Sequence, residues 1–303
     1  MAFAIAILAA LWAGLQPGPH AVGYVHFESG EPMDVWYPAS APGQPLTFAQ
    51  YLGGREADTR ALLGESSAKF LDAPTFATRE AAPAARPAPL VLIAQGNGQD
   101  AADQAVLAEY IASHGYLVAS VPSPMIRQPM TEQSQIGSFA EKQADALEAA
   151  MRRVSAILPV RRGRVAVIGH SFGARAALLL AMRQPHIRAL VSLDGGIGTS
   201  TGVDEMRTAP SFQRTARLPA TLHIYEDLDP FMKPDFAFLK SLRIRRLRIE
   251  KANDMHHAHF TTYGFAAAAI PDFAKVTNAG PEIRSNVAAM ARTVLQFLNA
   301  ELK

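Results

Sequence analysis

Ser171 lies at the centre of the pentapeptide Gly-His-Ser-Phe-Gly at residues 169–173. An apolar run at 165–168 precedes this pentapeptide, and a segment rich in alanine and leucine at 174–182 follows it. Strand, Gly-x-Ser-x-Gly and helix in this order are typical of a nucleophile elbow, a sharp turn that exposes the serine hydroxyl. The flanking glycines lack the Cβ atoms that would obstruct the turn. The pattern predicts that Ser171 is a nucleophile and that the N–H of Phe172 can stabilise an oxyanion.

Histidines downstream of the serine are the candidate general bases, because a serine hydroxyl needs a base within hydrogen-bond reach. His257 is preferred and His256 is the alternative, since both follow the last predicted strand, where the base of this arrangement belongs. His259 lies in the same loop, whereas His223 lies inside a predicted strand and is expected to be structural. Three histidines in four residues could bind zinc, but the spacing on a loop is not a recurrent ligand pattern. We therefore predict no metal site, and for His170 we expect a packing role.

Two aspartates compete for the role of the acid that would orient the base. Asp194 ends the strand that follows the elbow helix, and Asp229 ends the next strand along the chain. The position of Asp229 is the commoner location of the acid in α/β-hydrolases. The sequence pattern alone leaves both candidates open.

Composition indicates a globular protein with a substantial core. The chain has 303 residues, 49% of them apolar, which suits one large α/β domain or two small ones. Its net charge of +2 gives no sign of a nucleic-acid partner. Basic clusters at 161–164 and 243–248 each flank a predicted strand and are expected to be solvated loop ends. The absence of cysteine excludes disulfides and thiol catalysis.

The N-terminal run at residues 2–15 is apolar or small, and Gln-Pro-Gly-Pro at 16–19 ends it. It is shorter than the about 20 residues that a membrane span needs, but it fits the apolar region of a secretory signal. No lysine or arginine precedes the run, and no clean Ala-x-Ala site ends it, so a helix retained on the fold is the alternative. We expect a signal peptide at 1–20, a periplasmic or secreted protein, and no stable membrane span.

Strands alternate with helices along the rest of the chain, which predicts an α/β fold with a mostly parallel sheet and helices on both faces. The two strands at 21–29 and 33–37 are predicted to form an antiparallel hairpin. The later strands are expected at 90–94, 116–121, 165–168, 187–193, 221–225 and 247–249. Residues 21–303 are predicted to form a single domain, with a small cap-like insertion at about 46–80. Ligands of such sheets bind at the carboxyl ends of the strands, where the elbow, both aspartates and the histidine loop all fall.

Several segments resemble the platelet-activating-factor acetylhydrolase family of α/β-hydrolases and its bacterial esterase relatives. Gly-Pro-His-Ala-Val-Gly at 18–23 and Val-Trp-Tyr-Pro at 35–38 are similar to the family's N-terminal signature. The elbow at 169–173, Leu-Asp-Gly at 193–195 and His-Ala-His-Phe at 257–260 are similar to its nucleophile, acid and base segments. The resemblance spans roughly residues 17–262. It favours Asp194 as the acid and leaves Asp229 as the alternative.

The turn Gln-Gly-Asn-Gly at 95–98 stands where that family has a His-Gly-x-Gly oxyanion turn. The resemblance therefore implies that the N–H groups of Asn97 and Phe172 form an oxyanion hole. Gln95 replaces the usual histidine, Ala174 follows the elbow where glycine is common, and the cap segment has no matching motif.

The expected activity is hydrolysis of a carboxylic ester by a Ser-His-Asp triad through an acyl-enzyme, without metal or organic cofactor. The expected partner is a small-molecule ester or lipid-like substrate; the sequence does not predict an oligomeric state. One alternative keeps the chemistry and changes the bond to an amide, thioester, lactone or polyester. The other is a catalytically silent α/β-hydrolase scaffold used for binding.

Overall fold

A mixed, mostly parallel sheet forms the centre of the computed structural model, which describes residues 14–30, 32–54, 56–123, 133–200 and 203–303. Nine strands of the described residues follow one another in the order β3-β1-β2-β5-β4-β6-β7-β8-β9. They are β1 Ala21–Phe27, β2 Met33–Ala39, β3 Ala77–Arg79, β4 Ala88–Ala94, β5 Leu117–Val121, β6 Val160–His170, β7 Ile187–Leu193, β8 Arg217–Tyr225 and β9 Arg243–Lys251. Only β2 runs antiparallel to its neighbours, so β1 and β2 form the predicted hairpin.

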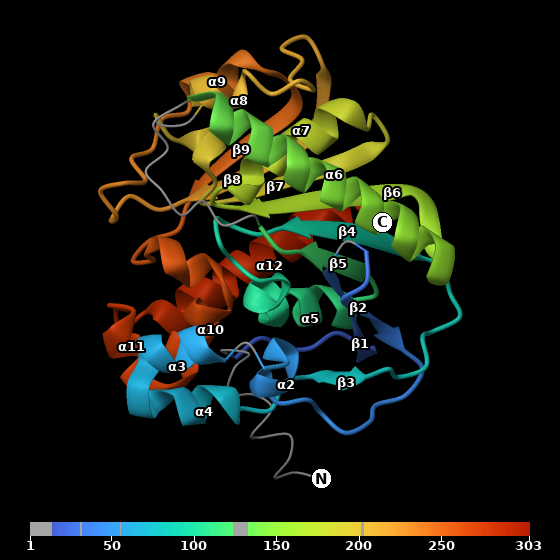
Figure 1. Ribbon diagram of the computed structural model, residues 1–303, viewed down its shortest axis with the longest axis vertical. Helices are drawn as coiled ribbons and strands as arrows, with labels where there is room; N and C mark the ends of the chain where they lie inside the picture. Colours follow the sequence, from blue (N-terminus) through green and yellow to red (C-terminus); the bar gives the residue numbers. More distant parts are fainter. Residues whose placement is uncertain (1–13, 31, 55, 124–132, 201–202) are drawn as a thin grey trace.

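Helices cover both faces of the sheet (Figure 1). On one face lie α5 Ala105–Ser113 and α12 Ile283–Leu302, and on the other lie α6 Gln133–Ile157 and α7 Gly173–Arg183. Strand β4 explains the two layers, since Val91 and Ile93 pack into one core while Leu90 and Leu92 pack into the other. Because side chains alternate across a strand, a strand covered on both faces reads as a continuous apolar run. This arrangement confirms the predicted fold class.

The segment predicted as a cap-like insertion contains α2 Phe48–Leu52, α3 Ala57–Leu63 and α4 Ser67–Leu71, and its end forms the edge strand β3. These helices lie beside α10 Thr262–Ala269 and α11 Pro271–Val276 (Figure 1). The contact includes Phe70, whose ring lies 5.2 Å from that of Phe273.

Glu109 connects this insertion to helix α5 by hydrogen bonds. Its carboxylate is fully buried and accepts hydrogen bonds from the Tyr51 hydroxyl and from the N–H groups of Phe76 and Ala77. A buried carboxylate needs such partners, because an unpaired one would cost several kcal/mol. A role of the insertion as a cap over the site stays a prediction.

The two basic clusters do not flank strands, so that prediction was wrong. Residues 161–164 lie within β6, and β9 covers nine residues where only 247–249 had been predicted. Strand β9 is an edge strand that pairs only with β8, and most of its side chains face water at least in part. Charged side chains on an edge strand discourage its pairing with another chain. A search for apolar runs therefore does not find the full length of such a strand.

Most of the predicted signal peptide, residues 1–13, lies outside the described residues. The residues that follow pack on the fold. Leu15 is buried, and the Gly18 N–H donates to Ser113 Oγ at 2.9 Å. No helix of the described residues is long and apolar enough to cross a membrane.

Candidate active site

Ser171 occupies a sharp turn between β6 and α7. Its φ of 52° lies in the left-handed region, which few non-glycine residues adopt. A Cβ on Gly169 would lie 2.4 Å from Ala174 Cα, and one on Gly173 would lie 2.2 Å from the carbonyl oxygen of Ala94. Both contacts are with backbone, so only glycine fits at either position. The local sequence therefore forces the turn that presents the serine hydroxyl.

Three side chains from distant parts of the chain meet at this turn. His257 Nε2 lies 2.8 Å from Ser171 Oγ, and His257 Nδ1 lies 2.5 Å from Asp194 Oδ2. The serine follows β6, the aspartate follows β7, and the histidine begins a 3-10 turn at His257–Phe260 after β9. With Nδ1 protonated toward the carboxylate, Nε2 is free to accept the serine proton, which is the geometry that base-activated nucleophiles require.

Asp194 is held rigidly in place. Its φ is 43°, its N–H donates to the Ile224 carbonyl at 2.7 Å, and its Oδ1 accepts the N–H of Glu226 at 3.1 Å. Its side chain is only 3% exposed. Burial raises the pKa of Asp194, against the lowering effect of the hydrogen bond with His257. The carboxylate is thus in an environment where a neighbouring positive charge is strongly favoured.

Asp229, the alternative acid, contacts the same loop at a different point. Its Oδ2 accepts the backbone N–H of His257 at 2.7 Å, and its Oδ1 lies 2.9 Å from His256 Nδ1. Burial acts to raise the pKa of Asp229, but the hydrogen bonds from the His257 backbone and the His256 ring outweigh burial and lower it. Asp229 is therefore placed to position the backbone of His257, while its contact with a histidine ring is with His256.

His256, the alternative base, lies between Asp229 and Asn278, whose Nδ2 is 3.2 Å from His256 Nε2. His259 turns back on its own loop, with Nδ1 accepting the His256 N–H at 2.9 Å. Burial, followed by the charge of His256, lowers the pKa of His259 to about 4. The rings of His256, His257 and His259 therefore have different hydrogen-bond partners.

Glu226 lies next to the candidate site, and the sequence did not indicate it. It is fully buried, and its Oε2 accepts the N–H groups of Leu228 and of Asp229, the latter at 2.9 Å. Burial raises the pKa of Glu226, and the nearby charges of Asp194 and Asp229 raise it further. Its only sequence signal was its place in the acidic strand end Glu-Asp-Leu-Asp at 226–229.

His170 packs directly against His257, the candidate base. Its ring stacks on that of His257 with centroids 4.9 Å apart, and its Nδ1 lies 2.8 Å from Gln99 Oε1. Burial, followed by the positive charge of His257, holds the pKa of His170 well below its usual value. A neutral ring in this position restricts the orientation of His257 without adding charge. No sequence signal indicated this contact.

The turn at residues 95–98 lies against the serine, since a Cβ on Gly96 would be 3.0 Å from Ser171 Cβ. Gln95 points into the interior, where its Nε2 donates to the Ala101 carbonyl at 3.1 Å and to Ser120 Oγ at 2.8 Å. The glutamine that departs from the family pattern therefore anchors the turn. Asn97, the predicted oxyanion donor, directly follows Gly96 in this turn.

The large apolar side chain of Phe231 is exposed beside His257, the candidate base. The Phe231 ring meets His257 edge-on at 5.3 Å and is 60% exposed, and Leu228 of the same loop is 48% exposed. Exposed apolar groups beside a polar centre are typical of ligand-binding surfaces.

Comparison with solved structures supports the fold. The chain is similar to a ferulic acid esterase from Streptomyces cinnamoneus, with a TM-score of 0.70 and 20% identity over 94% of this chain and 90% of that one. Searches of family models and of curated proteins return no match. Likeness at this level of identity shows the α/β-hydrolase fold, and the relation to the platelet-activating-factor acetylhydrolase family stays a prediction.

Proposed function

We propose that this protein is a serine hydrolase that cleaves carboxylic esters through an acyl-enzyme intermediate. The observation that carries the proposal is the unbroken chain of hydrogen bonds from Asp194 through His257 to Ser171. Each member comes from the carboxyl end of a different parallel strand, which is where enzymes of this architecture keep their chemistry.

In the first half-reaction, Ser171 Oγ attacks the ester carbonyl carbon while His257 Nε2 takes the hydroxyl proton. The imidazolium that forms is stabilised by Asp194, whose burial makes an adjacent positive charge favourable. The N–H groups of Asn97 and Phe172 are the proposed donors to the oxyanion, each contributing on the order of 3 kcal/mol. Collapse of the tetrahedral intermediate breaks the bond to the alcohol oxygen, which receives the proton from His257.

In the second half-reaction, His257 takes a proton from a water molecule that attacks the acyl-enzyme. The second tetrahedral intermediate releases the carboxylic acid, and His257 returns the proton to Ser171 Oγ. Asp229 acts on both half-reactions as a positioning residue, because it holds the backbone of His257. No step requires a metal or an organic cofactor.

A substrate with an apolar group fits the site best, since Phe231 exposes apolar surface beside His257, and Leu228 of the same loop is also exposed. The esterase activity named for the similar structure supports an ester over another acyl bond. A platelet-activating-factor acetylhydrolase-like specificity and a secreted or periplasmic location are part of the proposal. Amide, lactone and polyester substrates remain the second candidates, to be ranked by a hydrolysis screen across acyl chain lengths.

A fluorophosphonate probe tests the proposal, because only an activated serine reacts with it. Wild type and the control Ser285→Ala, which changes an exposed serine, should both be labelled, and Ser171→Ala should not. Hydrolysis of p-nitrophenyl acetate by Ser171→Ala should fall by far more than a hundredfold, since losing this group in a comparable triad costs about 10⁶. Unlabelled wild type would favour the silent scaffold, and a loss of less than a hundredfold would contradict the role of Ser171.

A further inference from the structure

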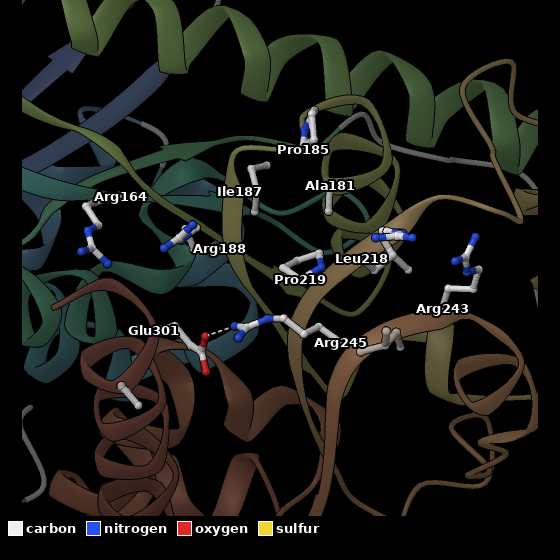
Figure 2. Close-up of a pocket in the computed structure, with 13 residues that line it drawn as sticks. Arg164, Ala181, Pro185, Ile187, Arg188, Leu218, Pro219, Arg243, Arg245 and Glu301 are labelled. Carbon is white, nitrogen blue, oxygen red and sulfur yellow. Dashed lines mark hydrogen bonds and ion pairs between the residues drawn. The ribbon is translucent and has the colours of Figure 1, made fainter.

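Five arginines from the amino-terminal halves of the last four strands line a cleft of about 730 Å³, which Figure 2 shows in close-up. They are Arg164 of β6, Arg188 of β7, Arg217 of β8, and Arg243 and Arg245 of β9. Arg164 lies near the middle of β6, and Ser171 directly follows its last residue, seven residues further along, which corresponds to about 23 Å along an extended strand. The cleft is therefore separate from the candidate active site.

The charge in this cleft is poorly compensated. Its one lining carboxylate, Glu301, is only 6% exposed and is shared by Arg245 and by the neighbouring Arg246. Five arginines and one glutamate give the lining a formal net charge of +4, although the whole chain carries only +2. Within the described residues, Arg164, Arg188 and Arg217 form no ion pair.

Strand pairing places two of these arginines side by side. Arg217 and Arg243 are direct partners in the parallel register of β8 and β9. Like charges directly opposite on neighbouring strands destabilise a sheet. Protection of an exposed edge explains arginines on β9, which is the edge strand. It does not explain Arg164, Arg188 and Arg217, which belong to the inner strands.

We propose that this cleft binds a small molecule carrying a diphosphate group. Arginine guanidinium groups bind phosphate oxygens in pairs, and the arginines of four strands place several such groups along one concave site. The terminal phosphoryl group of an organic diphosphate carries about two negative charges at neutral pH and the inner one carries about one, so the +4 of the lining can compensate the whole group. The volume lies within the range of ligand pockets, and Leu218 and Pro219 line the cleft with apolar surface suited to an organic body.

Calorimetric titration of the full-length protein with inorganic pyrophosphate at constant ionic strength tests this site. Wild type should show saturable binding of one pyrophosphate. The double variant Arg217→Gln/Arg243→Gln should lose about tenfold in affinity for each arginine, because hydrogen bonds between charged groups are strong. The control Arg60→Gln/Arg86→Gln makes the same charge change at exposed positions outside the cleft and should bind within twofold of wild type. Equal losses in both double variants, or unsaturable binding, would overturn the proposal.

A thermal unfolding series separates ligand binding from a structural role. Without ligand, Arg217→Gln should unfold at the same or a higher temperature than wild type, because it relieves the repulsion from Arg243. Pyrophosphate should raise the unfolding temperature of wild type and not that of the double variant. A lower unfolding temperature of Arg217→Gln without ligand would show that Arg217 serves the fold and would contradict the proposal.

Two further titrations identify the form of the ligand. Tighter binding of a nucleoside diphosphate than of pyrophosphate would indicate an organic molecule whose body contacts Leu218 and Pro219, as proposed. Weaker binding of the nucleoside diphosphate would refute the organic ligand. Hydrolysis at Ser171 should be unchanged in the double variant, so the outcome here does not depend on the proposed esterase activity.

Discussion

Replacing Asp194 by asparagine should cost more activity than replacing Asp229. Replacing Asp229 by asparagine should cost more stability than replacing Asp194. Both aspartates contact the loop that carries His257, one through the ring and one through the backbone. Asparagine has the shape of aspartate and tolerates the left-handed backbone found at Asp194. The two substitutions therefore change charge and hydrogen bonding while leaving the backbone undisturbed.

The Asp194→Asn variant should lose activity severely. Its amide N–H would donate to His257 Nδ1, which forces the proton of the neutral ring onto Nε2. That proton would then face Ser171 Oγ at 2.8 Å, so the ring could not accept the serine proton. The same change in a chymotrypsin-type triad costs about 10⁴ in kcat, because it leaves the imidazole in the wrong tautomer. We expect a loss of similar order here.

The Asp229→Asn variant should lose activity only moderately. Its amide oxygen can still accept the His257 N–H, but the charge-assisted bond to His256 is weakened. A hydrogen bond involving a charged group contributes about 1.5–3 kcal/mol, and about 1.4 kcal/mol corresponds to a factor of ten in rate. We therefore expect kcat to fall about tenfold, and by not more than about a hundredfold.

For thermal stability the order should be reversed, with Asp229→Asn less stable than Asp194→Asn. The raised pKa of Asp194 means that the folded protein holds its proton more tightly than the unfolded chain, so its ionised form costs stability at neutral pH. A neutral asparagine removes this cost. It also removes a negative charge that repels the buried carboxylate of Glu226. The lowered pKa of Asp229 means that its ionised form stabilises the fold above a pH of about 4, and asparagine removes that contribution.

The assay combines p-nitrophenyl acetate hydrolysis with thermal unfolding at pH 7, and Asp72→Asn is the control because Asp72 is exposed. Asp194→Asn should be nearly inactive and unfold at or above the wild-type temperature. Asp229→Asn should remain active and unfold at a lower temperature. A larger activity loss in Asp229→Asn, or a marked drop in the unfolding temperature of Asp194→Asn, would refute this reasoning.

Two further predictions concern pH and the N-terminus. Burial lowers the pKa of His223 to about 4, so the unfolded chain binds the proton more tightly than the folded protein does. The stability advantage of wild type over His223→Gln should therefore shrink as the pH falls from about 6.5 to about 4. An advantage that is constant with pH would contradict this. N-terminal sequencing of protein from the native host should place the mature start between residues 10 and 23, and the burial of Leu15 favours a start no later than Gly14. An intact Met1 on cytoplasmic protein would reject the signal peptide.

Most of the fold could be predicted because the central strands are covered on both faces. The apolar runs at 90–94 and 187–193 correspond to β4 and β7, whose residues are almost all buried. Edge strand β9 carries charges on both faces, so neither an apolar run nor an alternating pattern marks it. The failure to place the two basic clusters has the same origin, since a pattern search that requires apolar residues begins each strand too late.

The candidate site was only partly predictable, because local patterns place residues on elements but do not aim side chains. Ser171 follows from the constraints on its own turn. Asp194 and Asp229 end neighbouring parallel strands, and periodicity does not distinguish them. Their separate contacts with His257 depend on the positive φ of Asp194 and on the backbone hydrogen bonds around Glu226. These are three-dimensional features that the spacing of residues does not encode.

The parallel sheet also explains why opposite charges gather at its two ends. Parallel strands bring all their carboxyl ends to one edge and all their amino ends to the other, so residues at equivalent places on successive strands accumulate. At the carboxyl ends, Asp194, Glu226 and Asp229 each accept hydrogen bonds from the chain itself. At the amino ends, most of the arginines of the cleft have no such carboxylate partner among the described residues. Locally compensated charges suit side chains that position a base, whereas uncompensated charges in a concave site suit an anion supplied from outside.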